Sequence, residues 1–190
     1  MPNANKIKYG ICNVHYAVGT PGNNNTMTYA SPKPFPGAVS LSLDAEGETN
    51  NFYADNIVYY VTNANNGYSG SLEMALVTDD FAADILGEIT DANTGLSYEV
   101  QDADPVHFAL MFQFEGDKKK VRHVMYNCVA TRPSVAGSTK EESIEPQTET
   151  VEITASSIYV TDLDASVVKA RCLEDSTAYA DFFTSVQIPQ

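Results

Sequence analysis

The chain has 190 residues and a formal net charge of −14, because 25 Asp and Glu outnumber 11 Lys and Arg. A chain this acidic repels the phosphate backbone of nucleic acid, and no apolar run reaches the roughly 18 residues of a membrane-spanning helix, so both function classes are disfavoured. The length suits one domain, 1–190, and 11 Tyr with 8 Phe and no Trp favour pleated sheet.

The first quarter of the chain predicts two strands joined by a loop. Apolar and polar residues alternate over 6–18 and again over 38–47, which is the period of a strand with one buried face. Three prolines lie between Ser31 and Gly37, so the segment between the strands is expected to be a loop with at most a short edge strand. The residues expected on the buried face of the second strand are Val39, Leu41 and Leu43.

The next segment predicts a polar loop followed by two strands. Phe52 and Tyr53 lie in the polar run "ETNNFYADN", and a β-rich run extends from Ile57 to Val61. The following strand alternates in "GYSGSLEMALV", and its apolar side is expected to hold Leu72, Met74 and Leu76.

At Thr78 the pattern changes from a strand to one short helix. Thr78 is a good N-cap, Asp79 and Asp80 suit the first turn, and Gly87 is placed to end the helix. The stripe expected to be apolar consists of Phe81, Ala82, Ile85 and Leu86. A helix of about 12 Å is too short to persist alone, so it must dock on a sheet.

The second half of the chain again predicts strands. After the turn "TDANTG", the segment 96–101 is a strand, and 105–132 is a long hairpin with the tip "EGDK". One face of its first arm is expected to hold Val106, Phe108, Leu110, Phe112 and Phe114.

The C-terminal third begins with 133–150, an acidic connection long enough to be functional or mobile. The segments 151–160 and 165–174 are expected to form a final strand pair, and 175–186 one or two helical turns. We find no internal repeat and no domain boundary, and we treat 1–6 as an N-terminal arm.

The signatures of metal, phosphate and nucleophile sites are missing, so no catalytic residue, metal or cofactor is expected. His107 and His123 flank the arms of the hairpin and are expected to be able to meet, but two histidines make a poor metal site. The D-x-D segments 101–105 and 161–166 lack the rest of a calcium loop and indicate polar turns.

The cysteines and the first residues suggest the setting in which the chain folds. Cys12, Cys128 and Cys172 lie far apart without C-x-x-C spacing, which predicts small buried side chains rather than a disulfide framework. The start of the chain has no signal-peptide pattern, so we expect folding in a cytoplasm.

Positive charge is concentrated at the hairpin tip, where Lys118, Lys119 and Lys120 are followed by Arg122 and His123. Two interpretations remain open. The lysines can simply keep a solvated hairpin from aggregating. Alternatively, the tip of one copy meets an acidic loop of the next, such as "KEESIEPQTE", and steers the two together.

Several segments of the sequence resemble those of a known protein family. The segments "DAEGETNNFYADN", "TDDFAADILGE" and "QFEGDKKKVRH" with "YNCVATRP" are similar to the major tail tube proteins of bacteriophages with long, non-contractile tails. The similarity extends from about Lys6 to Pro189. It implies a mainly β fold, a β-sandwich or flattened barrel with one short helix packed outside, and it brings no cofactor or catalytic residue.

The resemblance also implies a function in the virion. Subunits of that family form hexameric rings that stack into a tube, tape-measure protein fills the lumen during assembly, and double-stranded DNA passes through at infection. Tail terminator and distal tail proteins would meet the tube ends, and no membrane is involved. Candidate contacts between subunits are Phe35, Phe52 and Tyr53, each of which can instead fold back on its own domain, together with Lys118, Lys119 and Lys120.

The acidity gains a mechanism, because a basic wall would trap the genome that an acidic wall lets pass. We therefore expect an acidic lumen, with the three lysines directed towards a neighbour, and ordering of 1–6 and 133–150 on stacking. The alternatives are a β-sandwich adhesin or carbohydrate-binding module, a carboxylate-based hydrolase, and the tube of a contractile tail or injection machine.

Overall fold

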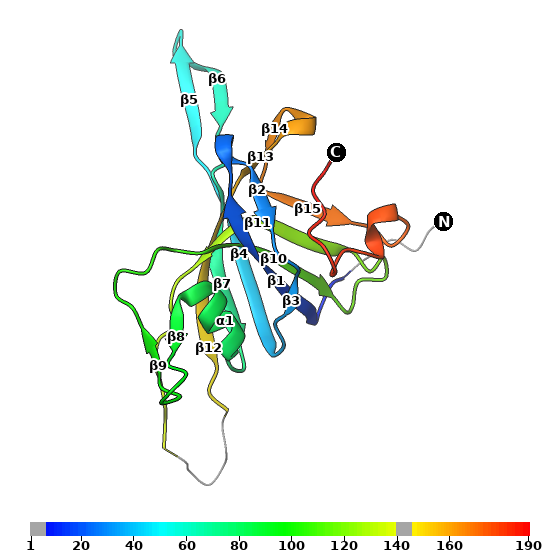
Figure 1. The fold of residues 1–190 in the computed structure, drawn as a ribbon. Coiled ribbons are helices and arrows are strands. Elements are labelled where there is room, and N and C mark those ends of the chain that lie inside the picture. The colour runs from blue at the N-terminus through cyan, green and yellow to red at the C-terminus, as the bar shows by residue number, and fades with distance from the viewer. Residues whose placement is uncertain (1–6, 140–145) are drawn as a thin grey trace.

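The computed structural model describes residues 7–139 and 146–190, and its main feature is a nine-stranded antiparallel sheet (Figure 1). Its strands are β1 (Ile11–Pro21), β2 (Met27–Tyr29), β3 (Lys33–Pro34), β4 (Ala38–Glu46), β7 (Gly67–Met74), β10 (His107–Phe114), β11 (Arg122–Ala130), β12 (Glu149–Ser156) and β15 (Lys169–Cys172). The order is β2-β1-β10-β11-β12-β7-β4, with β3 also paired to β1 and β15 to β11. β1 and β4 approach each other although they lie far apart in this order, so the sheet folds over its core.

Three pairs of strands form small sheets of their own. They are β5 (Thr49–Ala54) with β6 (Ile57–Asn63), β8 (Glu88–Thr90) with β9 (Ser97–Glu99), and β13 (Ile158–Val160) with β14 (Ala165–Val167). Short 3-10 turns lie at Asn23–Asn25, Thr161–Leu163 and Thr177–Tyr179. The predicted fold class, a mainly β protein resembling a sandwich with one short helix, is confirmed.

Hydrophobic cores lie on both faces of the central strand β10. Phe108, Leu110 and Phe112 belong to the larger core, as the alternating pattern predicts. Ala109 and Met111, on the opposite face, belong to a second core. The C-terminal segment covers this second core with Phe182 and its neighbours. Both faces of β10 are therefore buried, which explains why its sequence is a nearly continuous apolar run.

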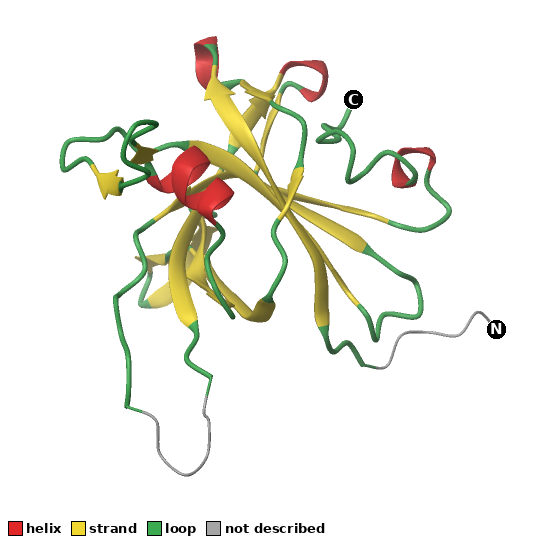
Figure 2. Ribbon diagram, turned by 60° about the horizontal axis from the view of Figure 1, so that its bottom comes forward, coloured by secondary structure: helices red, strands yellow, loops and turns green. Residues whose placement is uncertain are grey.

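The helix forms at the predicted place, as an α turn, α1 (Asp79–Phe81), that continues into a π turn, η2 (Ala82–Leu86). Thr78 Oγ1 accepts a hydrogen bond from Phe81 N at 3.4 Å, and Gly87 ends the helix with φ of 77°. Both predicted ends are confirmed. Figure 2 shows the helix in red lying across the strands.

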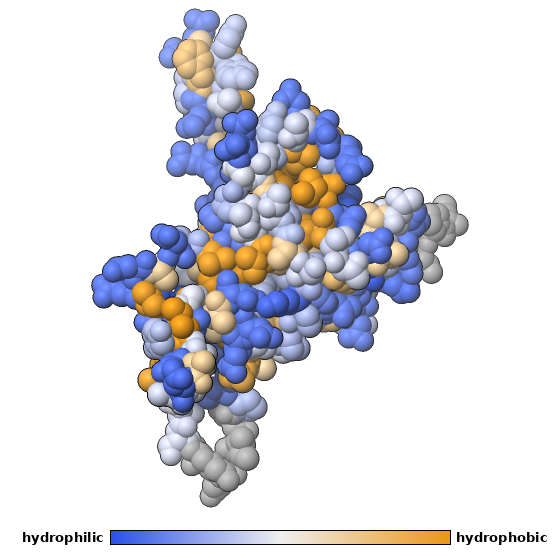
Figure 3. Space-filling model, viewed as in Figure 1, coloured by the Kyte–Doolittle hydropathy of each residue, from blue (hydrophilic) through white to orange (hydrophobic). Residues whose placement is uncertain are grey.

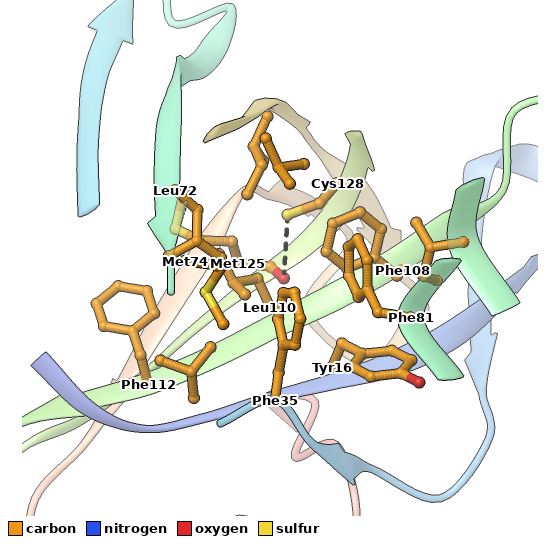
Figure 4. Packing of buried hydrophobic residues seen from close by; sticks show 14 of the residues in the cluster. Tyr16, Phe35, Leu72, Met74, Phe81, Phe108, Leu110, Phe112, Met125 and Cys128 are labelled. Carbon is orange, nitrogen blue, oxygen red and sulfur yellow. Dashed lines mark hydrogen bonds between the residues drawn. The ribbon is translucent and has the colours of Figure 1, made fainter. Parts of the chain in front are cut away.

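The underside of the helix is fixed to the core by aromatic contacts (Figure 4). The ring of Phe81 stacks on Phe35 with centroids 4.2 Å apart, and it meets Tyr16 and Phe108 edge-on. The hydroxyl of Tyr16 donates to Asp84 on the helix at 2.8 Å, and Lys33 Nζ lies 2.5 Å from the same carboxylate oxygen. The predicted docking of the apolar stripe is confirmed.

Three sequence predictions about strands are wrong in detail. The first strand begins at Ile11 rather than at residue 6, because Gly10 adopts φ of 67° and turns the chain. Val39 is exposed, since the register between β4 and β7 shifts between Ala38 and Ser40. Leu76 is also exposed, because it lies beyond the end of β7.

The expected final strand pair and the expected acidic connection also need correction. β13 pairs with β14, but β12 pairs with β7 and β11, and β15 pairs with β11 alone. The connection predicted over 133–150 ends earlier, because β12 already begins at Glu149. The arm 1–6 and residues 140–145 lie outside the described residues.

The cysteines behave as the sequence predicts. All three are free thiols, and Cys128 and Cys172 are buried while Cys12 is half-buried. Burial raises the pKa of the Cys128 thiol to about 12, which keeps it protonated and unreactive at neutral pH. No helix in the described part of the chain has both the length and the apolar character to span a membrane.

We expect Gly67→Ala to destabilise the protein by about 2–4 kcal/mol. Gly67 has φ of 108°, and a Cβ atom added there would lie 2.0 Å from the carbonyl oxygen of Ala155 on β12. Chemical denaturation measures the change. Gly137→Ala is the matched control, because a Cβ there meets nothing within 4 Å, and equal stability of the two variants would contradict the prediction.

Candidate functional site

The most unusual feature of the surface is a hairpin that extends away from the body of the molecule (Figure 1). We call residues 49–63, formed by β5 and β6, the projecting hairpin. Its two-residue turn, Asp55–Asn56, has φ of 51° and 61°, the left-handed conformation that tight hairpin turns require. Among the described strands, β5 and β6 pair only with each other.

The projecting hairpin is apolar although it is surrounded by solvent. Its exposed large side chains are Phe52, Tyr53, Ile57, Val58, Tyr59, Tyr60 and Val61, each between 46% and 70% exposed. Asp55 is the single charged residue among the 15. A two-stranded hairpin is marginally stable alone in water, and a contiguous apolar surface usually marks a contact with another molecule.

The two faces of this hairpin are both apolar. Cross-strand partners point to the same side of a hairpin, so Phe52 and Tyr60 share one face. The next pair, Tyr53 and Val58, follows a shift in register and is also exposed. Because successive residues of a strand point to opposite sides, Tyr53 lies on the other face from Phe52. A strand pair with aromatic or aliphatic groups on both sides is suited to burial on both sides.

A second exposed apolar region surrounds the hairpin of β8 and β9. Its exposed residues are Leu76, Ile89, Leu96, Tyr98 and Val100. Figure 3 shows apolar residues at the place of β8 and β9 in the same view as Figure 1. Arg132 ties this hairpin to the body, with an ion pair to Glu99 at 3.2 Å and a hydrogen bond to the Val100 carbonyl at 2.7 Å.

The basic tip between β10 and β11 is tied to the C-terminal segment. Lys120 Nζ forms an ion pair with Glu174 at 2.8 Å, and the Lys120 carbonyl accepts from the Tyr179 hydroxyl at 2.9 Å. The buried Asp117 carboxylate accepts from the backbone N–H groups of Lys119 and Val121. Lys120 is thus paired within its own chain, although its side chain is exposed like those of Lys118 and Lys119.

A groove of about 220 Å³ opens between β4 and the strands β10, β11 and β15. Its apolar and aromatic side chains include Leu41, Leu43, Tyr68, Phe112, Phe114 and His123. Two ammonium groups lie over its rings, because Lys8 Nζ is 4.8 Å from the centre of Phe114 and Lys169 Nζ is 4.3 Å from the centre of Tyr68. We call this feature the basic groove.

Histidine 123 lies in the basic groove and stacks on Phe112, with ring centroids 5.3 Å apart. Burial lowers the pKa of His123, and the positive charges of Lys8, Lys169 and Arg171 lower it further, while Asp117 opposes them. The folded protein therefore favours neutral His123.

We expect His123 to make the folded state less stable in mild acid. Because its pKa is lower in the folded chain than the ordinary 6.5, its contribution to stability is complete above that value and is lost as the pH falls through and below it. The measurement is the denaturation midpoint of the protein and of His123→Phe between pH 7.5 and 5. A difference between the two that stays constant over this range would contradict the prediction.

The structure separates the three aromatic residues predicted to contact neighbouring subunits. Phe35 is fully buried in its own core against Phe81, so its ring is not available to a neighbour and the alternative of folding back holds. Phe52 and Tyr53 are exposed on the projecting hairpin, which replaces the polar loop that the sequence predicted. The signal for it was the pair Asp55–Asn56, two residue types that tolerate a tight turn, between the aromatic residues Phe52 and Tyr53 and the β-rich run Ile57 to Val61.

His107 and His123 do not meet in the structure. His123 lies opposite Phe112 in the strand register, whereas His107 lies at the start of β10, where Nδ1 is 2.7 Å from Asn127 Oδ1. Among residues 7–139 and 146–190, no three His, Cys, Asp or Glu side chains gather closely enough to hold a metal ion. The segment 161–166 is a polar turn between β13 and β14, as predicted.

No model of a protein family matches the chain, and no curated protein matches it either.

Proposed function

We propose that this protein is a structural subunit that assembles with copies of itself into stacked rings, forming the tail tube of a bacteriophage with a long, non-contractile tail. The projecting hairpin is the observation that carries this proposal. Its seven large apolar side chains stand in solvent on both faces of a strand pair with one charge. Assembly buries that surface, and the hydrophobic gain is about 25 cal/mol for each Å² removed from water.

The rest of the molecule suits a wall rather than a catalyst. The fold is mainly β, with β2 and β4 at the two ends of the strand order of its large sheet. The sequence resemblance supplies the finer proposal of hexameric rings around tape-measure protein, closed at the ends by tail terminator and distal tail proteins. The protein would then reside in the virion tail after assembly in the host cytoplasm.

The charge suits a conduit for double-stranded DNA. With a net charge of −14, each copy repels phosphates, and screening confines the repulsion to about 8 Å in physiological salt. In the proposed tube the lumen is acidic, and Lys118 and Lys119 face a neighbouring subunit or ring. A map of surface potential on an assembled tube that showed a basic lumen would contradict this part.

Electron microscopy of the purified chain tests the proposal. We expect negative-stain images over a concentration series to show rings at lower and tubes at higher concentration, with light scattering reporting the mass. Rings or tubes in the wild-type protein support the proposal. A dispersed monomer at every concentration would contradict it and would favour the adhesin or carbohydrate-binding module, for which glycan binding is the direct assay.

A further inference from the structure

The projecting hairpin has its one charge at its tip. Asp55 occupies the first position of the turn, with the cross-strand pair Ala54 and Ile57 immediately behind it, and Tyr53 with Val58 next. Asp55 is thus presented at the far end of the hairpin, ahead of an apolar stem. A surface that complements this tip needs cations at its entrance and an apolar floor.

The basic groove has that combination in a chain that is otherwise strongly acidic. Its floor includes the half-buried side chains of Leu41, Leu43 and Phe114. Lys8 and Lys169 stand at its rings, and Arg171 adds positive potential, as its effect on the pKa of His123 indicates. Three of the 11 Lys and Arg of the chain, namely Lys8, Lys169 and Arg171, are thus at or near this groove.

The size of the groove favours part of a protein over a small molecule. At about 220 Å³ it is smaller than the roughly 300–1,000 Å³ typical of ligand pockets, and it has room for a few side chains. The projecting hairpin of the same chain points away from the body in Figure 1, so a hairpin tip that enters this groove has to belong to another copy.

We propose that the basic groove receives the tip of the projecting hairpin of a second copy, with Asp55 between Lys8 and Lys169 and the adjoining apolar side chains on Leu41, Leu43 and Phe114. This inference rests on the proposed self-assembly and identifies its contact. The two surfaces are different patches of the chain, so the contact is heterologous. Repetition of a heterologous contact closes a ring or extends a filament, whereas a symmetric contact would stop at a dimer.

Charge reversal and charge exchange test the contact. The variants are Asp55→Lys, the pair Lys8→Glu with Lys169→Glu, and the chain that carries all three changes. Asp55, Lys8 and Lys169 are exposed. Asp55 also has φ of 51° in the hairpin turn, so circular dichroism must verify that each variant keeps the fold. Asp104→Lys is the matched control, because it makes the same change in charge as Asp55→Lys at an exposed position outside both the projecting hairpin and the basic groove.

We expect Asp55→Lys and the groove pair each to raise the concentration at which polymer first appears by at least about tenfold, because like charges are then opposed. The chain with exchanged charges should recover most of this loss, and Asp104→Lys should behave like wild type.

The outcomes separate this inference from the proposed function. Wild-type polymer together with unchanged assembly of Asp55→Lys and of the groove pair would overturn the hairpin-to-groove contact and leave the tube proposal standing. A loss of assembly in Asp104→Lys as large as in Asp55→Lys, or no recovery on charge exchange, would also overturn the contact. Wild-type protein that remains monomeric would overturn both proposals.

Discussion

Replacing Phe81 with aspartate is expected to unfold the protein and to abolish assembly with it. The ring of Phe81 is fully buried between Phe35, Tyr16 and Phe108. Loss of a buried Phe ring costs about 3–5 kcal/mol, and a carboxylate without a partner in the same place costs more. The sum is comparable with the entire stability of an ordinary domain, about 5–15 kcal/mol.

Circular dichroism and chemical denaturation measure this effect. Ala83→Asp is the matched control, because it introduces the same side chain on the same helix at an exposed position. The control should lose less than about 1 kcal/mol. A folded Phe81→Asp variant that still assembles would show that the helix is not the anchor described above.

Replacing Phe52 and Tyr60 with serine is expected to have the opposite signature, normal folding without assembly. These side chains form one cross-strand pair on the projecting hairpin and are exposed in the single chain. Stability of the monomer should therefore change by about 0.5 kcal/mol or less. Assembly should be lost, because truncation of buried aromatic anchors typically removes most of the binding energy at a contact.

Sedimentation and electron microscopy report assembly, and thermal denaturation reports the fold. The matched control replaces Asn50 and Thr62 with serine, since these residues form the next cross-strand pair on the same face of the hairpin. The control should assemble like wild type. Tubes formed by the variant that lacks Phe52 and Tyr60 would remove the projecting hairpin from the contact.

Local signals made the helix and the central hairpin predictable from sequence. Thr78 and Gly87 determine the ends of the helix through their own backbone preferences, and the nearly continuous apolar run of β10 reflects its position between two cores. Which distant strands pair with each other was harder to predict from the sequence. Nothing within 151–174 indicates that β12 and β15 both pair with β11, because such pairing depends on residues more than 20 positions away.

The candidate site was only partly predictable for a related physical reason. The sequence marks Phe35 and Phe52 equally, as aromatic residues in polar or proline-rich surroundings. Burial distinguishes them, and burial follows from which segment the helix covers. The basic groove was also beyond prediction, because Lys8 and Lys169 come together only when the two ends of the chain meet across the sheet.

The nearly uncharged projecting hairpin is a hazard for newly made subunits, because an exposed apolar strand pair invites indiscriminate aggregation. The charge of −14 on the whole chain opposes that hazard by keeping copies apart before assembly begins. In the proposed assembly, ionic strength would set the balance between colloidal stability and polymerisation. Salt that screens the acidic bodies from each other weakens the barrier to contact, so the solution conditions set when a pool of monomers starts to associate.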